Sequence, residues 1–356
     1  MKDIQQQIDK WLAAGEDVAI ATVVDVEGSA PRPSGSRLAL TRAGAMMGSV
    51  SGGCVESDVH ERAIAVLDGA EASLVAYGPA PADGFEVGLS CDGNIQVLIE
   101  RFVADDVWQS VRRSIENDRP AAMATVVSPE ALRGARLGLC EEESGALTRV
   151  GSIHPAIDEQ VAVAAKERLA ARGRTSIDIR IDGNDCRVFI ETFAPPQRIY
   201  LVGATHIAVS LCRMAKELGF NVYLIDPRTA FADSERFEAA HQILHEWPVD
   251  VLDGAVLDAD AYVLTLTHDA KFDLPTLARA LESDVRYIGA LGSRKTHLRR
   301  LESLRAQGFD EQALSRIKTP VGLDLGGRSP EEIALAILAE MVATRYARDG
   351  GPLSSA

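Results

Sequence analysis

The stretch that decides the fold of the second half of the chain is RIYLVGATHIAVSLCRMAKELGFNVYLIDPR, residues 198–228. An apolar run is followed by a turn at Gly203, a helical segment and a second apolar run that ends at Asp226. This is the order of a Rossmann βαβ unit, in which an acid about 20 residues beyond the first glycine holds a ribose hydroxyl. The stretch therefore predicts an α/β fold, with a Rossmann-like, doubly wound parallel sheet in residues 196–356.

The glycine fingerprint of a dinucleotide site is incomplete in this stretch. The pattern G-x-G-x-x-G/A is met by Gly203 and Ala208, but Thr205 stands at the middle position. Its branched side chain intrudes where the backbone should approach a pyrophosphate. The change weakens the case for NAD(P) as a cofactor and leaves the fold prediction intact.

Further strands are expected to place polar loops at the same edge of this sheet. Residues 261–269 and 285–295 read as parallel strands whose carboxyl ends carry such loops, where open α/β sheets bind ligands. The loop GALGSRK (289–295) suits an anionic ligand, or is a solvated basic turn. The two histidines at strand ends are ligand contacts or hydrogen-bonded structural residues. The candidate cofactor-binding residues of this half are Gly203, His206, Asp226, Arg228, His268, Gly292, Arg294 and Lys295.

The first 195 residues contain an internal repeat, which the linker FAPPQ (193–197) separates from the second half. Each copy predicts the order strand, turn, strand, helix, strand, strand, and we expect the copies to cover one another's apolar faces. The echoes are AIATVV (19–24) with AMATVV (122–127), GSRLAL (35–40) with GARLGL (134–139), and VLIERF (97–102) with VFIETF (188–193). The predicted domains are 1–104 for copy one, 105–195 for copy two and 196–356 for the Rossmann-like part.

Two glycine-flanked cysteine loops are present in copy one alone. SGGCVE (51–56) stands where copy two has HPAIDE (154–159), and GLSCDGN (88–94) where copy two has the shorter DGNDC. Because the scaffold is duplicated without them, these loops predict chemistry. Glycines allow close approach to the backbone, and free amides at a helix start favour an anion or a thiolate. The alternative is that both cysteines are small buried hydrophobes. The candidate cofactor-binding residues here are Gly52, Gly53, Cys54, Glu56, Ser90 and Cys91.

Charge and cysteine usage exclude several classes of partner. The 356 residues carry a formal net charge of −15, so neither nucleic acid nor an anionic membrane surface is an expected partner. No apolar run approaches about 18 residues, so no membrane span is expected. The five cysteines are scattered singly, without a C-x-x-C pair. With no signal-peptide pattern at the start, this usage predicts a reducing cytoplasm.

Three groups of motifs together resemble one family, and the resemblance covers nearly the whole chain. They are SVSGGCVESDV with GLSCDGN, then GATHIAVSLCRMAKELGFNVYLIDPR, then YIGALGSRK with VGLDLGGRSPEEIALAILAE. In these motifs the chain resembles the XdhC/CoxI group, the xanthine dehydrogenase accessory proteins. The family usually has a glycine where Asp92 stands, and G-A-G-H where this chain has Gly203-Ala204-Thr205-His206. The second departure puts the ligand of the nucleotide-like pocket in doubt.

The resemblance implies a function in cofactor maturation. Proteins of this family bind molybdenum cofactor (molybdopterin) and shield it, and they support its sulfuration together with a cysteine desulfurase. They then insert it into a molybdenum hydroxylase client of the xanthine dehydrogenase type, and they tend to be homodimers. By the same resemblance, Cys54 and Cys91 lie at the cofactor site and are candidate contacts to molybdenum or its sulfur.

Two other functions remain open at this point. An NAD(P)-binding oxidoreductase would use the Rossmann-like domain and Asp226, and a redox sensor would join Cys54 to Cys91 in a reversible disulfide. The chain also lacks the clustered cysteines of iron–sulfur centres. We therefore expect an accessory protein that does not oxidise xanthine alone, and no catalytic residue is assigned.

Overall fold

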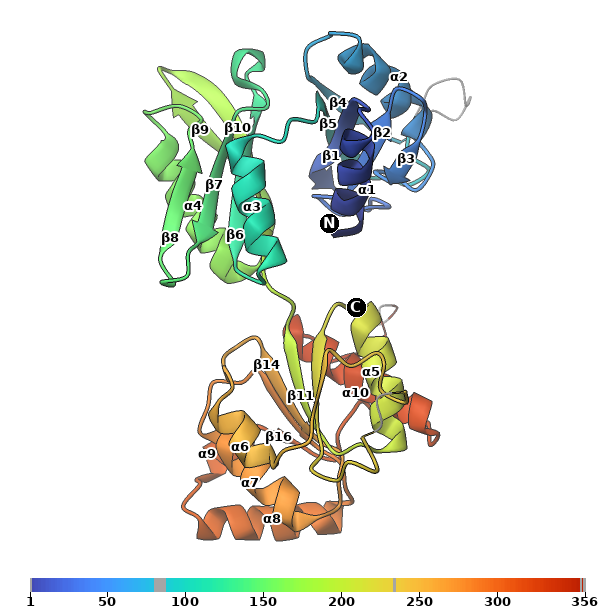
Figure 1. Cartoon of the computed structure of the whole chain (residues 1–356), viewed down its shortest axis with the longest axis vertical. Helices are drawn as coiled ribbons and strands as arrows, with labels where there is room; N and C mark the ends of the chain where they lie inside the picture. The colour runs from blue at the N-terminus through green and yellow to red at the C-terminus, as the bar shows by residue number, and fades with distance from the viewer. Residues whose placement is uncertain (1, 80–87, 233–234, 353, 355–356) are drawn as a thin grey trace. The chain divides into compact units, whose positions relative to one another are not determined.

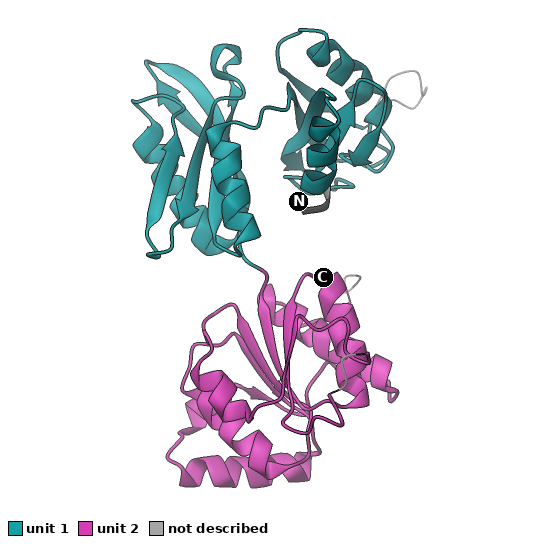
Figure 2. Cartoon of the chain, viewed as in Figure 1, with its two compact units in different colours: residues 1–195 teal, residues 196–356 magenta. Residues whose placement is uncertain are grey.

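The chain divides into two compact units, Met1–Pro195 and Pro196–Ala356 (Figure 2). The computed structural model describes all residues except 1, 80–87, 233–234, 353 and 355–356. No helix in the described parts of the chain is long and apolar enough to cross a bilayer.

Copy one of the repeat is an antiparallel five-stranded sheet with strand order β3-β2-β1-β5-β4 (Figure 1). A cluster beneath helix α2 forms its core, and helix α1 precedes its first strand. The elements are α1 Lys2–Ala13, β1 Val18–Glu27, β2 Arg37–Thr41, β3 Met46–Gly48, α2 Glu56–Leu67, β4 Ser73–Tyr77 and β5 Asn94–Arg101.

Copy two has the same strand order, β8-β7-β6-β10-β9, so the predicted duplication is confirmed. Each copy has one more strand than the sequence predicted, because β3 and β8 precede the helix. The repeat also begins one helix earlier, since α3 stands before β6 as α1 stands before β1. The elements are α3 Asp106–Glu116, β6 Ala121–Ser128, the 3-10 helix η1 Glu130–Leu132, β7 Arg136–Glu141, β8 Leu147–Gly151, α4 Asp158–Ala171, β9 Arg174–Ile181 and β10 Asn184–Phe193.

Strand β1 is buried on both faces because each face meets a different partner. Ala19, Ala21 and Val23 point into the core beneath α2. Val18 and Ile20 alternate with them and belong to a cluster that also contains residues of copy two, such as Trp108 and Met123. Strands with a period-two alternation normally bury one face. The apolar residues on both faces of β1 therefore reflect a second sheet packed on the first.

Two buried ion pairs cross between the copies in a reciprocal manner. Arg37 at the start of β2 donates to Glu191 on β10, with Nη1 to Oε1 at 3.0 Å. Arg136 at the start of β7 pairs with Glu100 on β5, with Nη2 to Oε1 at 2.7 Å. Both arginines occupy the same repeat position, in GSRLAL and GARLGL, and so do both glutamates. Each copy therefore supplies the counter-charge for the other.

Replacing Glu191 by alanine should destabilise unit 1 strongly, because Arg37 and Arg174 would both lose the buried carboxylate that they share. Breaking such a buried pair costs about 3–5 kcal/mol in the free energy of unfolding. Denaturant titration in a Trp247→Phe background measures this change by fluorescence, because the two remaining tryptophans, Trp11 and Trp108, both lie in or against the cluster shared by the copies.

Asp185→Ala is the matched control. Its pair with Arg180 is exposed, with side-chain exposures of 79% and 78%, and should change stability by less than about 1 kcal/mol. Equal effects of the two substitutions would contradict a structural role for the reciprocal pairs.

Unit 2 contains a six-stranded sheet of order β13-β12-β11-β14-β15-β16, in which every paired strand is parallel. The predicted α/β class with a doubly wound, Rossmann-like sheet is confirmed. The elements are β11 Arg198–Val202, α5 His206–Glu217, β12 Asn221–Ile225, β13 Gln242–Leu244, α6 Pro248–Asp253, β14 Ala261–Thr265, α7 Ala270–Leu281, β15 Tyr287–Ala290, α8 Arg294–Ala306, α9 Glu311–Leu314, β16 Ile317–Lys318 and α10 Pro330–Arg345.

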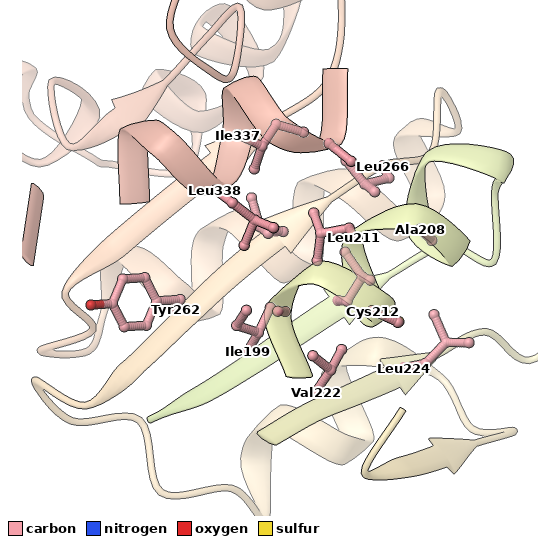
Figure 3. Packing of buried hydrophobic residues seen from close by; sticks show 14 of the residues in the cluster. Ile199, Ala208, Leu211, Cys212, Val222, Leu224, Tyr262, Leu266, Ile337 and Leu338 are labelled. Atoms are coloured by element: carbon pink, nitrogen blue, oxygen red, sulfur yellow. The ribbon is translucent and has the colours of Figure 1, made fainter. Parts of the chain in front are cut away.

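Helices cover both faces of this sheet. On one face, Leu211 of α5 and Ile337 of α10 pack with Ile199 and Tyr262 of the strands (Figure 3). On the other face, a second cluster joins the remaining strand side chains to α6, α7 and α8. Burial on both sides explains the continuous apolar runs of β11 and β14, since parallel sheets lack an exposed face.

Candidate functional sites in the two units

Helix α2 begins at Glu56, whose carboxylate turns back into the loop that precedes the helix. Its Oε1 accepts the N–H of Ser51 at 2.9 Å, and its Oε2 accepts the N–H of Gly53 at 2.8 Å. The amides of Val50 and Val55 donate to the same carboxylate at 3.2 and 3.3 Å. These four amides are therefore not free for a ligand anion, because a side chain of the loop already accepts them.

The same arrangement recurs in copy two. Asp158 at the start of α4 accepts the N–H groups of Ile153 and His154 at 2.9 and 3.0 Å and the hydroxyl of Ser152 at 2.5 Å. The loop of copy one is one residue longer, and its carboxylate is carried on the longer glutamate side chain. A carboxylate at this place therefore belongs to the duplicated scaffold, and we expect Glu56 to hold its loop rather than to contact a ligand.

The hydrogen bonds to Glu56 stabilise its ionised form. Burial raises the pKa of this carboxyl, but the bonds from the Ser49 and Ser51 hydroxyls and from the Ser51 and Gly53 amides outweigh burial and lower the pKa to about 2. The carboxylate therefore stays charged throughout the physiological pH range. The loop that carries Cys54 is braced by a group that does not titrate there.

Glu56→Gln should destabilise unit 1 by about 1–3 kcal/mol at pH 7, because hydrogen bonds to a charged acceptor are lost. The lowered pKa means that this contribution is present above pH 4.5 and is lost as the pH falls towards 2. Urea denaturation of the wild type and the variant at pH 7, 4.5 and 2.5 tests the dependence.

Glu159→Gln serves as the control, because that side chain is 87% exposed and lies next to the equivalent carboxylate of copy two. It should leave stability almost unchanged at every pH. If the wild type were more stable than Glu56→Gln by the same free energy of unfolding at pH 2.5 as at pH 7, the ionised Glu56 carboxylate would not be what stabilises the loop.

The two cysteine loops lie side by side in the structure. The Sγ of Cys54 is 3.4 Å from the Oγ of Ser90, and Cys91 follows directly. Both cysteines are partly exposed, carry free thiols and pack against the same apolar cluster beneath α2. The other three cysteines of the chain, Cys140, Cys186 and Cys212, are buried. The structure thus unites the segments that copy two lacks.

The glycines before Cys54 leave the backbone open. Gly52 and Gly53 have φ of +76° and +118°, which side chains other than glycine rarely adopt, and no atom lies within 4 Å of where a Cβ would stand. Asp92, in contrast, is not among the residues with positive φ, so its backbone does not require the glycine that the family usually has. The accessible surface here includes glycine backbone, two partly exposed thiols, the Ser90 side chain and the exposed side chain of Asp92.

The candidate residues of unit 2 also meet at one edge of the sheet. Gly203, Asp226, His268 and Gly292 follow β11, β12, β14 and β15, and the carboxyl ends of these neighbouring parallel strands share that edge. A Cβ on Gly203 would lie 2.5 Å from the Thr267 side chain, so the two loops are in close contact. The side chains exposed near the edge are His206, Arg228, His268, Arg294 and Lys295.

Asp226 is occupied by the chain itself. Asp226 is 1% exposed, and its carboxylate accepts a hydrogen bond from the N–H of Ala204 at 2.9 Å. It also accepts hydrogen bonds from Nε and Nη2 of Arg228 at 2.9 and 2.8 Å. Burial raises the pKa of Asp226, but the bonds from Arg228 and Ala204 lower it overall. The expected bond to a ribose hydroxyl would therefore have to displace these donors, and the geometry gives no support to the oxidoreductase alternative.

Thr205 has a local structural role. Its hydroxyl accepts the N–H of Ala208 at 3.3 Å and caps helix α5, as Ser293 caps α8 by accepting the N–H of Thr296 at 3.2 Å. The side chain that breaks the glycine fingerprint thus stabilises the helix start. In the part of the chain that the structure describes, no three His, Cys, Asp or Glu side chains gather as a metal-binding group.

One buried pair near this edge was not expected from the sequence. Arg300 of α8 donates to Asp273 of α7 and, at 2.9 Å, to the carbonyl oxygen of Leu291. Thr267 in turn donates to Asp273 at 2.5 Å. This pair ties the loop after β14 to the loop after β15. No spacing signal predicts it, because its partners are 27 residues apart.

Two family models match the chain. The XdhC and CoxI family matches residues 11–78, and the XdhC Rossmann domain matches residues 199–341. The first match contains Cys54, and the second contains the whole edge just described. The two models together cover more than half of the chain, which therefore belongs to the XdhC and CoxI family.

Three relatives align with almost the whole chain. A probable xanthine dehydrogenase subunit of Bacillus subtilis (strain 168) is 28% identical over 352 residues, 97% of this chain and 98% of that protein. The molybdenum cofactor insertion chaperone PaoD of Escherichia coli (strain K12) is 24% identical over 334 residues, 94% of this chain and 85% of that protein. The crystal structure of a xanthine dehydrogenase from Bacillus halodurans superposes with a TM-score of 0.76 at 24% identity, over 99% of this chain and 97% of that one.

Proposed function

We propose that the protein binds molybdenum cofactor and inserts it into a molybdenum hydroxylase of the xanthine dehydrogenase type. The observation that carries the proposal is the meeting of the two cysteine loops that only copy one possesses. The family membership and the relative named as a molybdenum cofactor insertion chaperone support the same function. A role in protecting the cofactor follows from holding it between synthesis and insertion.

The residues of copy one fit this cofactor in chemical type. The cofactor supplies a molybdenum centre on a dithiolene with exchangeable oxygen and sulfur ligands. The thiols of Cys54 and Cys91 are soft groups that suit such a centre. Gly52 and Gly53 offer open backbone, and the Ser90 hydroxyl offers a hydrogen-bond donor. Because Glu56 occupies the loop amides, we assign the ligand contacts to the thiols and the glycine surface.

The finer parts of the function extend the same proposal. Sulfuration of the cofactor requires a sulfur donor, for which a cysteine desulfurase is the expected partner. The thiols of the two loops are partly exposed, so a bound centre there would remain open to that partner. A homodimer and a cytoplasmic location complete the proposal, and the chain alone is expected not to oxidise xanthine.

Cys54→Ala should weaken the binding of molybdenum cofactor by about tenfold, equivalent to ~1.4 kcal/mol, because a soft contact to the metal or its sulfur is lost. The purified full chain is incubated with cofactor and passed through gel filtration, and molybdenum and pterin are quantified in the protein peak. Cys91→Ala tests the second loop in the same way.

Ala156→Ser is the matched control, because Ala156 stands two residues before the scaffold carboxylate of copy two, as Cys54 does in copy one. It should retain the wild-type cofactor content. Unchanged binding by both cysteine variants would exclude the loops as the cofactor site, and xanthine turnover by the cofactor-loaded chain would refute the accessory role.

A further inference from the structure

Three aromatic rings and two cations gather in unit 2 and form what we call the ring platform: Arg228, Phe231, Trp247, Lys271 and Phe272. The guanidinium carbon of Arg228 lies 4.7 Å from the ring centre of Phe231 and 5.5 Å from that of Phe272. The rings of Trp247 and Phe272 are 5.2 Å apart, and the Lys271 ammonium lies 4.8 Å from the Phe272 ring. One continuous set of cation–π and ring contacts therefore joins five side chains.

The platform is open to solvent on one side. Phe272 is buried, but Phe231 and Trp247 are 50% and 48% exposed, and the Arg228 side chain is 41% exposed. Burying a large aromatic side chain against a ligand contributes strongly to the free energy of binding. Two such rings stand half-open beside Arg228, which Asp226 holds, and Lys271, which pairs with Asp269 at 3.3 Å, and they suggest a surface that a ligand covers.

The position of the platform is where a parallel sheet binds ligands. Arg228 follows β12, Trp247 follows β13, and Phe272 lies in α7 just after β14. These loops share the carboxyl edge of the sheet with Gly203. Ligands of open α/β sheets lie outside this edge.

Asp226 fixes the Arg228 guanidinium in place with two hydrogen bonds. A guanidinium so held is pre-organised, so little conformational entropy is lost when it meets an anion. Its carboxylate partner is buried and committed, which leaves the cation, rather than the acid, as the group presented to a ligand.

We propose that the ring platform binds a planar heteroaromatic ring that carries a phosphate, with the ring stacked on Phe231 and Trp247 and the phosphate near Arg228. Bases and pterins stack on aromatic side chains, and arginine pairs with phosphate. Both the pterin of a molybdenum cofactor and the base of a nucleotide have this chemistry. The pterin arm of this proposal rests on the proposed function, whereas the nucleotide arm does not. Both arms concern unit 2 alone and hold whether or not the cysteine loops bind cofactor.

The test uses the full chain and three probes: NADPH and NADH, which are nucleotides with and without a 2′-phosphate, and purified molybdenum cofactor as the pterin. Trp247 is the only tryptophan in residues 196–356, so quenching of its fluorescence reports on the platform. The signal is taken as the difference between the wild type and Trp247→Phe. Calorimetry gives the affinity of each variant independently.

Phe231→Ala and Trp247→Ala should each lower the affinity for the probe that binds by about tenfold. Trp247→Phe should keep most of that affinity, because an aromatic ring remains. Arg228→Gln should weaken probes with a phosphate at the stacked ring end more than NADH, which lacks the 2′-phosphate. Tyr346→Ala, which removes an aromatic side chain that is 65% exposed elsewhere in unit 2, should change nothing. The probe that binds identifies the source of the ring.

Three results would overturn the proposal: no binding of any of the three probes to the wild type, equal binding by wild type and platform variants, or a dimer that these substitutions dissociate without any probe. The last would make the platform a protein interface. Failure of the platform leaves the cofactor content measured for the Cys54 and Cys91 variants untouched, so the two proposals can fail separately.

Discussion

Backbone N–H groups in the turns beside the candidate sites need acceptors, and in this protein side-chain carboxylates supply them. Glu56 collects four amides before α2, Asp158 does the same before α4 with two, and Asp226 takes an amide of the glycine turn after β11. An unpaired buried N–H is costly, so these bonds set the conformation of the turns. The amides that they bond are no longer available to an anion. In the two sites that we propose, recognition of a ligand would therefore depend on side chains, which are thiols in unit 1 and aromatic rings with a guanidinium in unit 2.

Much of the fold could be predicted from the sequence. In unit 1 the duplicated sheet leaves similar apolar sequences at equivalent strands, and in unit 2 the order of apolar and helical segments is that of a parallel sheet. The echo of AIATVV in AMATVV marks the two central strands, and the run from Arg198 to Asp226 marks the parallel sheet. Strand β3 could not be found in this way, because its three residues are all exposed and carry no burial pattern. Helices α1 and α3 share a position but few letters, so the repeat extends further in space than in sequence.

The candidate sites were predictable in part. Comparison of the copies singled out the loops of Cys54 and Cys91, and the structure brings them together at Ser90. The bond from the Gly53 amide to Glu56 has the three-residue spacing of a capping box, which the sequence interpretation did not use. The bond from the Ala204 amide to Asp226 joins residues 22 apart, so no local spacing indicates it. The sequence interpretation treats Thr205 only as a departure from the dinucleotide-binding glycine pattern. A threonine directly before a helix is also typical of a helix N-cap, which is the role that the structure shows.

The crossed pairs Arg37–Glu191 and Arg136–Glu100 have a consequence for the origin of unit 1. A half-length protein with one sheet would contain both the arginine and the glutamate, and two such molecules could pair them across their interface as the two copies do here. Fusing two such genes would preserve the twofold bonding while freeing each half to change alone. Loops could then change in one copy alone without loss of the ion pairs between the two sheets. In a symmetric dimer of half-length chains, every such change would have appeared in both subunits.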